Sequence, residues 1–339
     1  MYNSLLLRQV LESICGYNEN IEKIRRIIMK VIEIKDLVKK YDDLIAVDNI
    51  NLSIEKGEIY GLLGPNGAGK STLISIISSL LKQTSGTVKV FGIDTRKNRT
   101  DIKRKIGIVP QTIAVYKNFT AYENVKFFGE LYGLRKDKLK EAIDKALDFV
   151  GLDDVRNKKA EEFSGGMLRR LNIACALLHR PEIIIMDEPT VGIDPQSRNH
   201  ILNAVKKLNR EGATVIYTTH YMEEVESICT KIAIIDKGKV IVEGTKDELK
   251  DMINDKRVLK VKVNDTEKIN LQNIEKIKGV DRLKIKDNDL TIQTVKEVNN
   301  LDQIIKSLND SNVKILDLGF KEITLENVFL SLTGRNLRD

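Results

Sequence analysis

The stretch Gly64-Pro65-Asn66-Gly67-Ala68-Gly69-Lys70-Ser71-Thr72 decides how the rest of the chain is interpreted. It fits the phosphate-loop pattern G-x-x-x-x-G-K-[ST]. Residues 58–63 before it read as a short buried strand, and residues 71–81 after it carry apolar side chains at helical spacing. A strand, a glycine loop and a helix together turn backbone N–H groups and the positive helix end toward a phosphate. The sequence therefore predicts a nucleotide-phosphate site, and the alternative is a glycine-rich turn with a chance lysine.

Each residue type in this stretch has a physical role beside a phosphate. Glycine has no side chain and tolerates positive φ, so the backbone can wrap closely around an anion. Lys70 is expected to reach the β- and γ-phosphates, and the Ser71 hydroxyl is expected to hold Mg²⁺. The expected nucleotide-binding residues of the loop are Gly64, Pro65, Asn66, Gly67, Ala68, Gly69, Lys70, Ser71 and Thr72.

Composition limits the class of protein. The chain has 339 residues, 42% of them hydrophobic and 31% charged, which is enough for about two or three domains. No uninterrupted apolar run approaches the roughly 18 residues of a membrane span, so we expect a soluble chain. The net charge of +7 is spread along the chain, which favours a solvated surface over a nucleic-acid site. The 3 cysteines lie far apart and fit neither a disulfide framework nor a zinc site, and they indicate a reducing compartment.

Polar residues follow several predicted strands at the point where each strand ends. Gln111, the pair Asp187 and Glu188, and His220 each come directly after a strand-like apolar run. Because the carboxyl ends of parallel strands border one crevice, we expect these side chains to lie beside the phosphate loop. Asp187 suits Mg²⁺, Glu188 suits a general base that positions water, and His220 can donate to a γ-phosphate. The alternatives are an acidic turn and a structural histidine.

Two further features lie outside the phosphate loop. Ser164-Gly165-Gly166 opens a predicted helix, where Ser164 is expected to cap the helix and the glycines expose backbone N–H groups, which makes a second anion site. Tyr41 lies in a turn between two predicted strands. An exposed aromatic ring there could stack on a flat ligand ring, and the alternative is a hairpin tyrosine without a ligand.

Hydrophobic periodicity divides the chain into three regions. For residues 1–30, either Met29 is the true start or the extension is an amphipathic helix. Residues 31–250 form the main domain, with a helical subdomain over about 112–178, and residues 251–339 read as a small α+β domain. The expected fold class is α/β, with a mixed sheet flanked by helices and with antiparallel β and α-helical subdomains. The expected strands cover 31–37, 50–54, 58–63, 87–91, 105–109, 182–186, 214–217, 231–236, 239–243, 258–263, 283–286, 290–295 and 313–320, and the expected helices cover 71–81, 122–132, 136–150, 164–178, 195–210, 296–308 and 324–332.

Taken together, these segments resemble the ATP-binding subunit of an ABC transporter over residues 31–249. The motifs occur in the family's order along the chain. They are the adenine-stacking aromatic at Tyr41, the Walker A loop from Gly64 to Thr72, the Q-loop at Gln111, the signature Ser164-Gly165-Gly166, Walker B from Ile183 to Glu188, the D-loop Gly192-Ile193-Asp194, and the switch histidine His220.

The resemblance implies a P-loop NTPase core that binds ATP and Mg²⁺ and hydrolyses ATP. Its catalytic residues would be Lys70, Gln111, Glu188 and His220, and its Mg²⁺ ligands would be Ser71, Gln111 and Asp187. A head-to-tail dimer would place each ATP between the Walker A loop of one subunit and the other subunit's Ser164, Gly165, Gly166 and Asp194. The second subunit would be an identical copy or a paralogous ATPase subunit.

The signature departs from the commonest family form, Leu-Ser-Gly-Gly-Gln. Phe163 replaces the leucine and Met167 replaces the glutamine, and methionine cannot hydrogen-bond as an amide does. Residues 163–171 look like the bacterial ABC-2-type exporter branch, which transports drugs and antibiotics. Residues 324–329 resemble the tail of that branch, where Leu-Glu-x-Val-Phe recurs.

The resemblance implies the motor subunit of an exporter on the cytoplasmic face of the cell membrane. A multi-span permease on a separate chain would contact the helical region, 111–134, and no nucleic-acid partner is expected. One alternative is a soluble ABC ATPase that acts on ribosomes, DNA or metal-cluster assembly, although this chain has a single motor domain and no sustained heptads. Another is a sensor that binds ATP without turnover, which the intact Glu188 and His220 argue against. Cargo contacts would lie in the permease.

Overall fold

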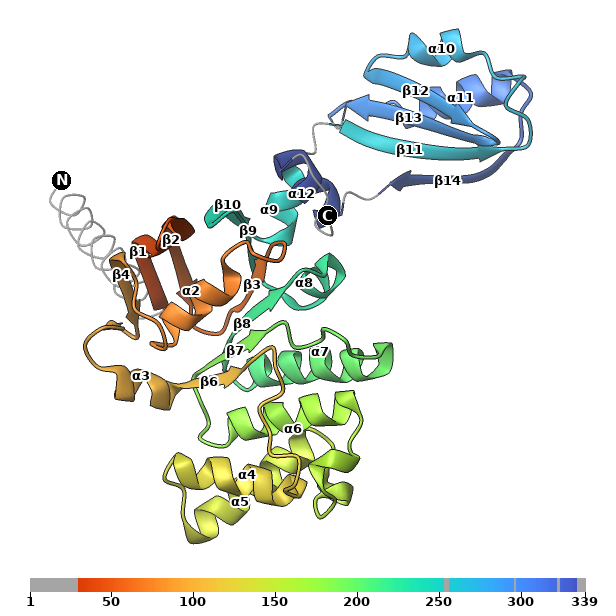
Figure 1. Ribbon diagram of the computed structural model, residues 1–339. Helices are drawn as coiled ribbons and strands as arrows, with labels where there is room; N and C mark the ends of the chain where they lie inside the picture. Colours follow the sequence, from red (N-terminus) through yellow and green to blue (C-terminus); the bar gives the residue numbers. More distant parts are fainter. Residues whose placement is uncertain (1–29, 253–255, 296, 322–323, 334–339) are drawn as a thin grey trace, which may run out of the picture. The chain divides into compact units, whose positions relative to one another are not determined.

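The computed structural model describes residues 30–252, 256–295, 297–321 and 324–333 (Figure 1). It forms two compact units, of which the first ends at Glu243 and the second begins at Gly244. The boundary expected after residue 250 falls inside helix α9 (Lys246–Asp251), which packs with α12 (Leu325–Thr333) in the second unit. The alternatives for residues 1–30 concern positions that lie, except for the last, outside the described residues.

The first unit is built on a six-stranded sheet. Its central strands are parallel, and β3 pairs with β8 so that Gly61 lies opposite Tyr217. The strands β3, β7 and β8 are buried along their whole length, as expected for strands that are covered on both faces. In sheet order the strands are β10 (Lys239–Gly244), β9 (Lys231–Asp236), β3 (Ile59–Leu63), β8 (Thr214–Thr219), β7 (Ile183–Asp187) and β6 (Ile106–Val109).

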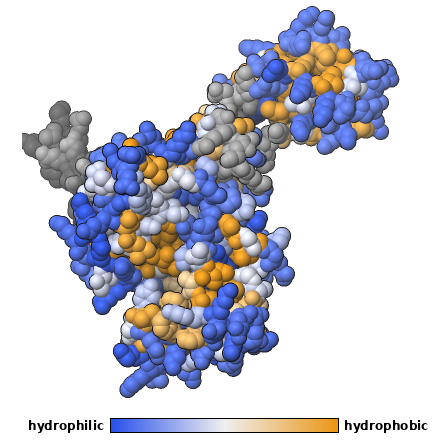
Figure 2. Space-filling model, viewed as in Figure 1, coloured by the Kyte–Doolittle hydropathy of each residue, from blue (hydrophilic) through white to orange (hydrophobic). Residues whose placement is uncertain are grey.

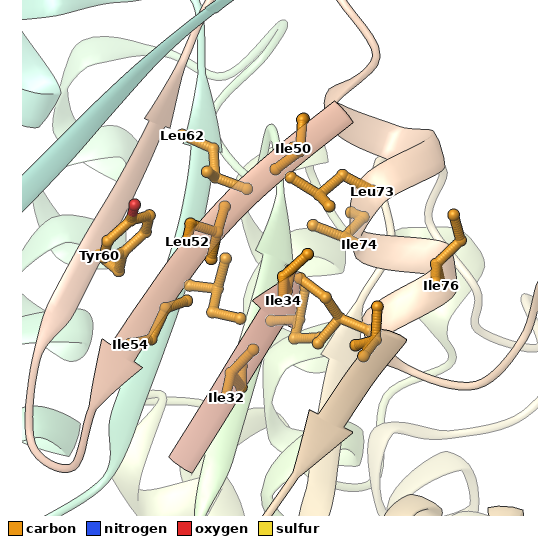
Figure 3. Packing of buried hydrophobic residues seen from close by; sticks show 14 of the residues in the cluster. Ile32, Ile34, Ile50, Leu52, Ile54, Tyr60, Leu62, Leu73, Ile74 and Ile76 are labelled. Carbon is orange, nitrogen blue, oxygen red and sulfur yellow. The ribbon is translucent and has the colours of Figure 1, made fainter. Parts of the chain in front are cut away.

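A four-stranded antiparallel sheet packs beside it. Its strand order is β2 (Leu44–Glu55), β1 (Lys30–Tyr41), β4 (Ser85–Val90) and β5 (Ile93–Asp94). Alternate residues of β2, at Ile50, Leu52 and Ile54, turn inward and meet the apolar face of α2 (Lys70–Ile77) and side chains of β3. Figure 3 shows these side chains facing Leu62, Leu73 and Ile76 across the core. This core fixes the antiparallel sheet against the phosphate loop, which lies between β3 and α2.

Three helices of the first unit form a separate helical part. Here α4 (Ala121–Leu131), α5 (Lys136–Phe149) and α6 (Gly165–Leu177) pack on one another. Thr120 caps α4 and exchanges hydrogen bonds with Glu123, and α5 buries one apolar stripe. The other helices of the unit are α3 (Arg99–Lys105), α7 (Pro195–Arg210) and α8 (Met222–Ile228). No helix among the described residues is both long and apolar enough to cross a membrane.

The second unit contains a four-stranded antiparallel sheet with its own core. The sheet order is β12 (Val280–Lys286), β13 (Asp289–Val295), β11 (Lys256–Val263) and β14 (Ile315–Lys321). The helices α10 (Leu271–Glu275) and α11 (Leu301–Asp310) bury Ile274, Ile304 and Leu308 in the same hydrophobic cluster as Leu259 and Ile292. This is a small α+β arrangement.

Some expected elements differ from the structure. The helix expected over 71–81 ends at Ile77, because Ser79 adopts φ 58 and turns the chain, which leaves Leu80 59% exposed. The helix expected from residue 296 begins at Leu301. Short helices α3, α8, α9 and α10 were not predicted, since five to seven residues carry too few turns for a periodic signal.

Candidate ATP-hydrolysis site

The phosphate loop is held in a shape that requires glycine at two positions. Gly69 has φ 102, and a Cβ there would lie 2.4 Å from the carbonyl oxygen of Ala46. A Cβ on Gly64 would lie 2.2 Å from the carbonyl oxygen of Ile235. The loop is also bonded to the β9–β10 turn, where Gly238 N donates to Ala68 O at 3.0 Å. Neighbouring backbone therefore fixes the loop from both sides.

Lys70 is the cation of this loop, and it is only 4% exposed. Its Nζ donates to Gly64 O at 2.7 Å and to Pro65 O at 3.0 Å, and it lies 3.3 Å from Glu188 Oε1. Burial lowers the pKa of the Lys70 ammonium, and the Glu188 carboxylate acts against that shift. The loop thus holds a buried positive charge at its centre, next to an acid.

The polar residues expected at the strand ends meet around Glu188, which follows β7 and has φ 45. Gln111 Nε2 donates to Glu188 Oε2 at 3.4 Å, and His220 Nδ1 lies 3.3 Å from the same oxygen. Because β3, β8, β7 and β6 are neighbours in the sheet, the groups that follow them share one edge. Lys70, Gln111, Glu188 and His220 therefore form one cluster.

A cavity of about 630 Å³ opens in front of this cluster. Tyr41 lies at its wall, 43% exposed, and so is accessible to a flat ring. Asp187, Pro65, Gly64 and His220 do not line the cavity directly. Its lining residues are Tyr41, Leu44, Ile45, Ala46, Asn66, Gly67, Ala68, Gly69, Lys70, Ser71, Thr72, Gln111, Glu188, Lys237 and Gly238.

The residues expected to hold Mg²⁺ offer only oxygen donors: the Ser71 hydroxyl, the Gln111 amide oxygen and the Asp187 carboxylate. This set suits Mg²⁺, which prefers hard oxygen ligands. Among the described residues, no group of three or more His, Cys, Asp or Glu is arranged to hold a metal. Because Mg²⁺ takes octahedral coordination, an ion held by these three residues would need oxygens of the nucleotide or of water as further ligands.

A second cluster lies apart from this cavity, and we call it the Ser164 cluster. It consists of Ser164, Gly165, Gly166 and Asp194. Ser164 caps α6, and its Oγ accepts a hydrogen bond from Met167 N at 3.3 Å. Asp194 caps α7, and its hydrogen bonds with Ser197 lower the pKa of the Asp194 carboxyl. A Cβ on Gly166 would lie 2.1 Å from Ser197 Oγ, so the two helix starts are in close contact. Within one chain the structure does not bring this second cluster to the phosphate loop.

Comparison with known proteins decides the family. The family model described as "ABC transporter" matches residues 47–191. The linearmycin resistance ATP-binding protein LnrL of Bacillus subtilis (strain 168) is 44% identical over 313 residues, which cover 91% of this chain and 100% of that protein. This chain belongs to the ABC transporter family.

Further relatives of this ABC ATPase support the same family assignment. The daunorubicin/doxorubicin resistance ATP-binding protein DrrA of Streptomyces peucetius is 34% identical over 314 residues, 91% of this chain and 94% of that protein. The dimeric, post-hydrolysis structure of the ATP-binding cassette MJ0796 with ADP and Pi superposes with a TM-score of 0.59. It is 32% identical and covers 63% of this chain and 98% of that one.

These relatives confirm the predicted fold class, the ATPase activity and the exporter branch. The ABC ATPase is the ATP-binding subunit of an exporter-type transporter, and the alternative of a soluble ATPase on ribosomes, DNA or metal clusters is not favoured. ABC ATP-binding subunits work with membrane permeases and dimerise. The matches to LnrL and DrrA extend beyond the first unit, so these two relatives share the second unit as well.

Sequence reasoning missed Thr218, which organises both acids of the ABC ATPase. Its Oγ1 donates to Asp187 Oδ1 at 2.6 Å and accepts from Glu188 N at 2.9 Å, and the residue is fully buried. The available signal was a hydroxyl residue at the carboxyl end of a strand, next to His220. Thr218 thus orients the Asp187 carboxylate and holds the backbone N–H of Glu188 through one hydroxyl group.

Replacing Thr218 with valine is expected to lower the Mg²⁺-dependent ATPase rate about tenfold, because hydroxyls that orient ligand carboxylates have effects of about this size. The matched control is Thr214→Val on the same strand. Thr214 is equally buried, but its Oγ1 accepts from Gly57 N at 2.9 Å, at the opposite end of β8. ATPase assays over a Mg²⁺ titration test this. Equal losses in the two variants would contradict the role of Thr218.

Proposed function

We propose that this chain drives export by binding MgATP at the cluster around Glu188 and hydrolysing it in a dimer. The observation that carries the proposal is that Glu188 lies between the Lys70 ammonium and the side chains of Gln111 and His220. An acid at that point can orient a water molecule for attack on the γ-phosphate. Lys70 and His220 then donate to phosphate oxygens as negative charge develops.

The other parts of the cavity serve binding. Tyr41 stacks on the adenine ring, and backbone N–H groups of the phosphate loop bind the phosphates. Ser71, Gln111 and Asp187 would hold Mg²⁺, which would supply neutralisation of the phosphate charge when bound. Asp187 is kept in place for this role by Thr218.

The second cluster completes the site of a neighbouring subunit. Ser164 and Gly165 are exposed at the start of α6, where N–H groups and the helix end attract an anion. They lie outside the cavity of their own chain, so in a head-to-tail dimer they bind the γ-phosphate on the other subunit. Each chain carries both halves, and a second copy or a paralogue can therefore provide the partner.

The permease binds, in this proposal, to exposed hydrophobic side chains of the helical part, which are Tyr116, Phe119, Leu131 and Tyr132. These side chains are between 38% and 66% exposed, and Figure 2 shows hydrophobic residues at the surface around α4. Asn124 fixes the loop that carries Tyr116 and Phe119, since its Oδ1 accepts from Tyr116 N at 2.7 Å and its Nδ2 donates to Tyr116 O at 2.9 Å. A rigid surface of this kind, at the cytoplasmic face of the membrane, can receive a helix of a separate multi-span permease.

A pull-down from native membranes tests this function. The tagged chain with Glu188→Gln, solubilised in mild detergent with MgATP, is expected to retain a multi-span membrane protein. Recovery of ribosomal proteins or DNA without any membrane protein would contradict the proposal.

Changing Tyr116 and Phe119 together to alanine is expected to lower recovery of the membrane partner about tenfold or more, because buried aromatic anchors dominate interface energies. ATPase activity of the purified chain should persist, since neither residue lines the cavity. Leu80→Ala serves as the control, because Leu80 is 59% exposed but lies outside the helical part. Normal recovery with the double variant would show that the permease binds elsewhere.

A further inference from the structure

Arg169 connects the helix that starts at Ser164 to the loop that carries Gln111. It lies on α6 and is only 3% exposed. Its Nη1 donates to Pro110 O at 2.6 Å and its Nη2 donates to Gln111 O at 2.5 Å. The two ends of one planar guanidinium thus hold two successive carbonyl groups, a geometry that a single ammonium cannot reproduce.

The loop held in this way reaches the reacting end of the site. Gln111 has its carbonyl bonded to Arg169, while its side chain donates to Glu188. At the other end, α6 begins with the Ser164 cluster, which faces the neighbouring subunit in the proposed dimer. Arg169 is therefore a direct side-chain link between one subunit's own site and the part of that subunit that serves the partner's site.

The environment of Arg169 is unusual for a purely structural arginine. No carboxylate among the described residues lies within ion-pair distance of it, and its Nε has no hydrogen-bond partner there. Burial lowers the pKa of the Arg169 guanidinium, while Tyr217 and Asp187 act against this. A buried charge without an ion pair is costly, so a role that requires this fork accounts for its presence.

We infer that Arg169 is a positioning residue that couples Gln111 to the start of α6, so that the partner-facing Ser164 cluster moves with the loop beside Glu188. The inference rests on the proposed function and gives Arg169 a role that the sequence motifs do not assign. Through this link, a displacement of the Gln111 loop beside one nucleotide site would be passed to the start of α6 that serves the second site.

The chain offers a matched control at the next position. Arg170 also lies on α6, and its Nη1 donates to Val150 O at 2.9 Å and to Gly151 O at 3.0 Å. Burial lowers the pKa of Arg170 as well. Val150 is the C-cap residue of α5 and Gly151 follows it, so Arg170 makes a comparable pair of bonds entirely within the helical part.

The test compares Arg169→Met with Arg170→Met in the full chain, with ATP as the probe. We expect Arg169→Met to lower kcat about tenfold and to bring the Hill coefficient for ATP toward 1, with Kd for ATP in the Glu188→Gln background unchanged. Arg170→Met is expected to lower Tm by a similar amount but to keep kcat and the Hill coefficient. Equal kcat losses in both variants, or a change in Tm alone for Arg169→Met, would overturn the inference.

A double-mutant cycle with Gln111→Ala separates positioning from stability. If Arg169 acts through Gln111, then Arg169→Met costs little further activity once the Gln111 side chain is gone. Losses that simply multiply would overturn the link. Should Arg169→Met fail to fold, Arg169→Lys, which keeps the charge and loses the fork, completes the same cycle. Absence of ATPase activity in the wild-type chain would refute the proposed function together with this inference, whereas normal wild-type activity with multiplying losses refutes the inference alone.

Discussion

Glu188→Gln is expected to lower kcat for ATP hydrolysis by about 10²–10⁴ while ATP binding persists. This corresponds to roughly 3–5 kcal/mol in the barrier. The amide keeps the size of the carboxylate and can still contact Lys70, which lies 3.3 Å away, but it cannot accept a proton from water. Turnover assays and equilibrium ATP binding on the same preparation separate the two effects.

The control for this variant is Glu182→Gln, which precedes the other end of β7. Glu182 is exposed and pairs with Lys105 at 2.6 Å, far from the phosphate loop along the strand. Its loss should leave turnover within about twofold, as exposed ion pairs contribute little. If Glu188→Gln hydrolysed ATP at the wild-type rate, another group would have to be the base.

The second large effect is expected from Lys70→Met. In the proposed function the Lys70 ammonium donates charge-assisted bonds to the phosphates, so ATP affinity should fall about tenfold or more. Loss of one donor to the developing charge should also reduce kcat by about 10²–10³. Methionine fills a similar volume, so the loss is one of charge and hydrogen bonding rather than packing. Nucleotide-binding titrations and single-turnover rates measure the two losses separately.

Lys237→Met provides the comparison for that substitution. Lys237 lines the same cavity but is exposed, in the turn before Gly238. A general effect of positive charge near the cavity would appear in both variants and would weaken with added salt. A specific role for Lys70 predicts that the Lys237 variant stays within a few-fold of wild type. Equal losses would argue against the assigned role of Lys70.

Much of the site was predictable because its signals are local or follow from sheet geometry. The phosphate loop is contiguous in sequence, so its strand, glycines and lysine could be recognised together. Gln111, Glu188 and His220 could be predicted to converge because each follows an apolar run and parallel strands end at one edge. The residues of the Ser164 cluster are predicted from sequence to bind an anion, and one chain does not bring them to the loop.

The features that could not be predicted from the sequence depend on contacts between distant segments or on single backbone angles. The motifs assign no role to Thr218 or Arg169. Their roles follow from the hydrogen bond of Thr218 Oγ1 to Asp187 and from those of the Arg169 guanidinium to the carbonyls of residues 110 and 111. Helix α2 ends early because Ser79 has a left-handed φ, which no local sequence pattern predicts. The strand order of the second unit is likewise set by pairing between β11 and β14, far apart in the chain.

The backbone bonds around the phosphate loop have a kinetic consequence. Gly238 contacts the loop through Ala68 and also accepts from Asp48 N at 2.8 Å, so strand β2, the loop and the β9–β10 turn are bonded in series. A loop that is already formed does not lose ordering entropy when nucleotide arrives. Association of ATP with the chain is therefore governed by diffusion and access to the cavity, and differences in affinity among variants arise mainly in the rate of release.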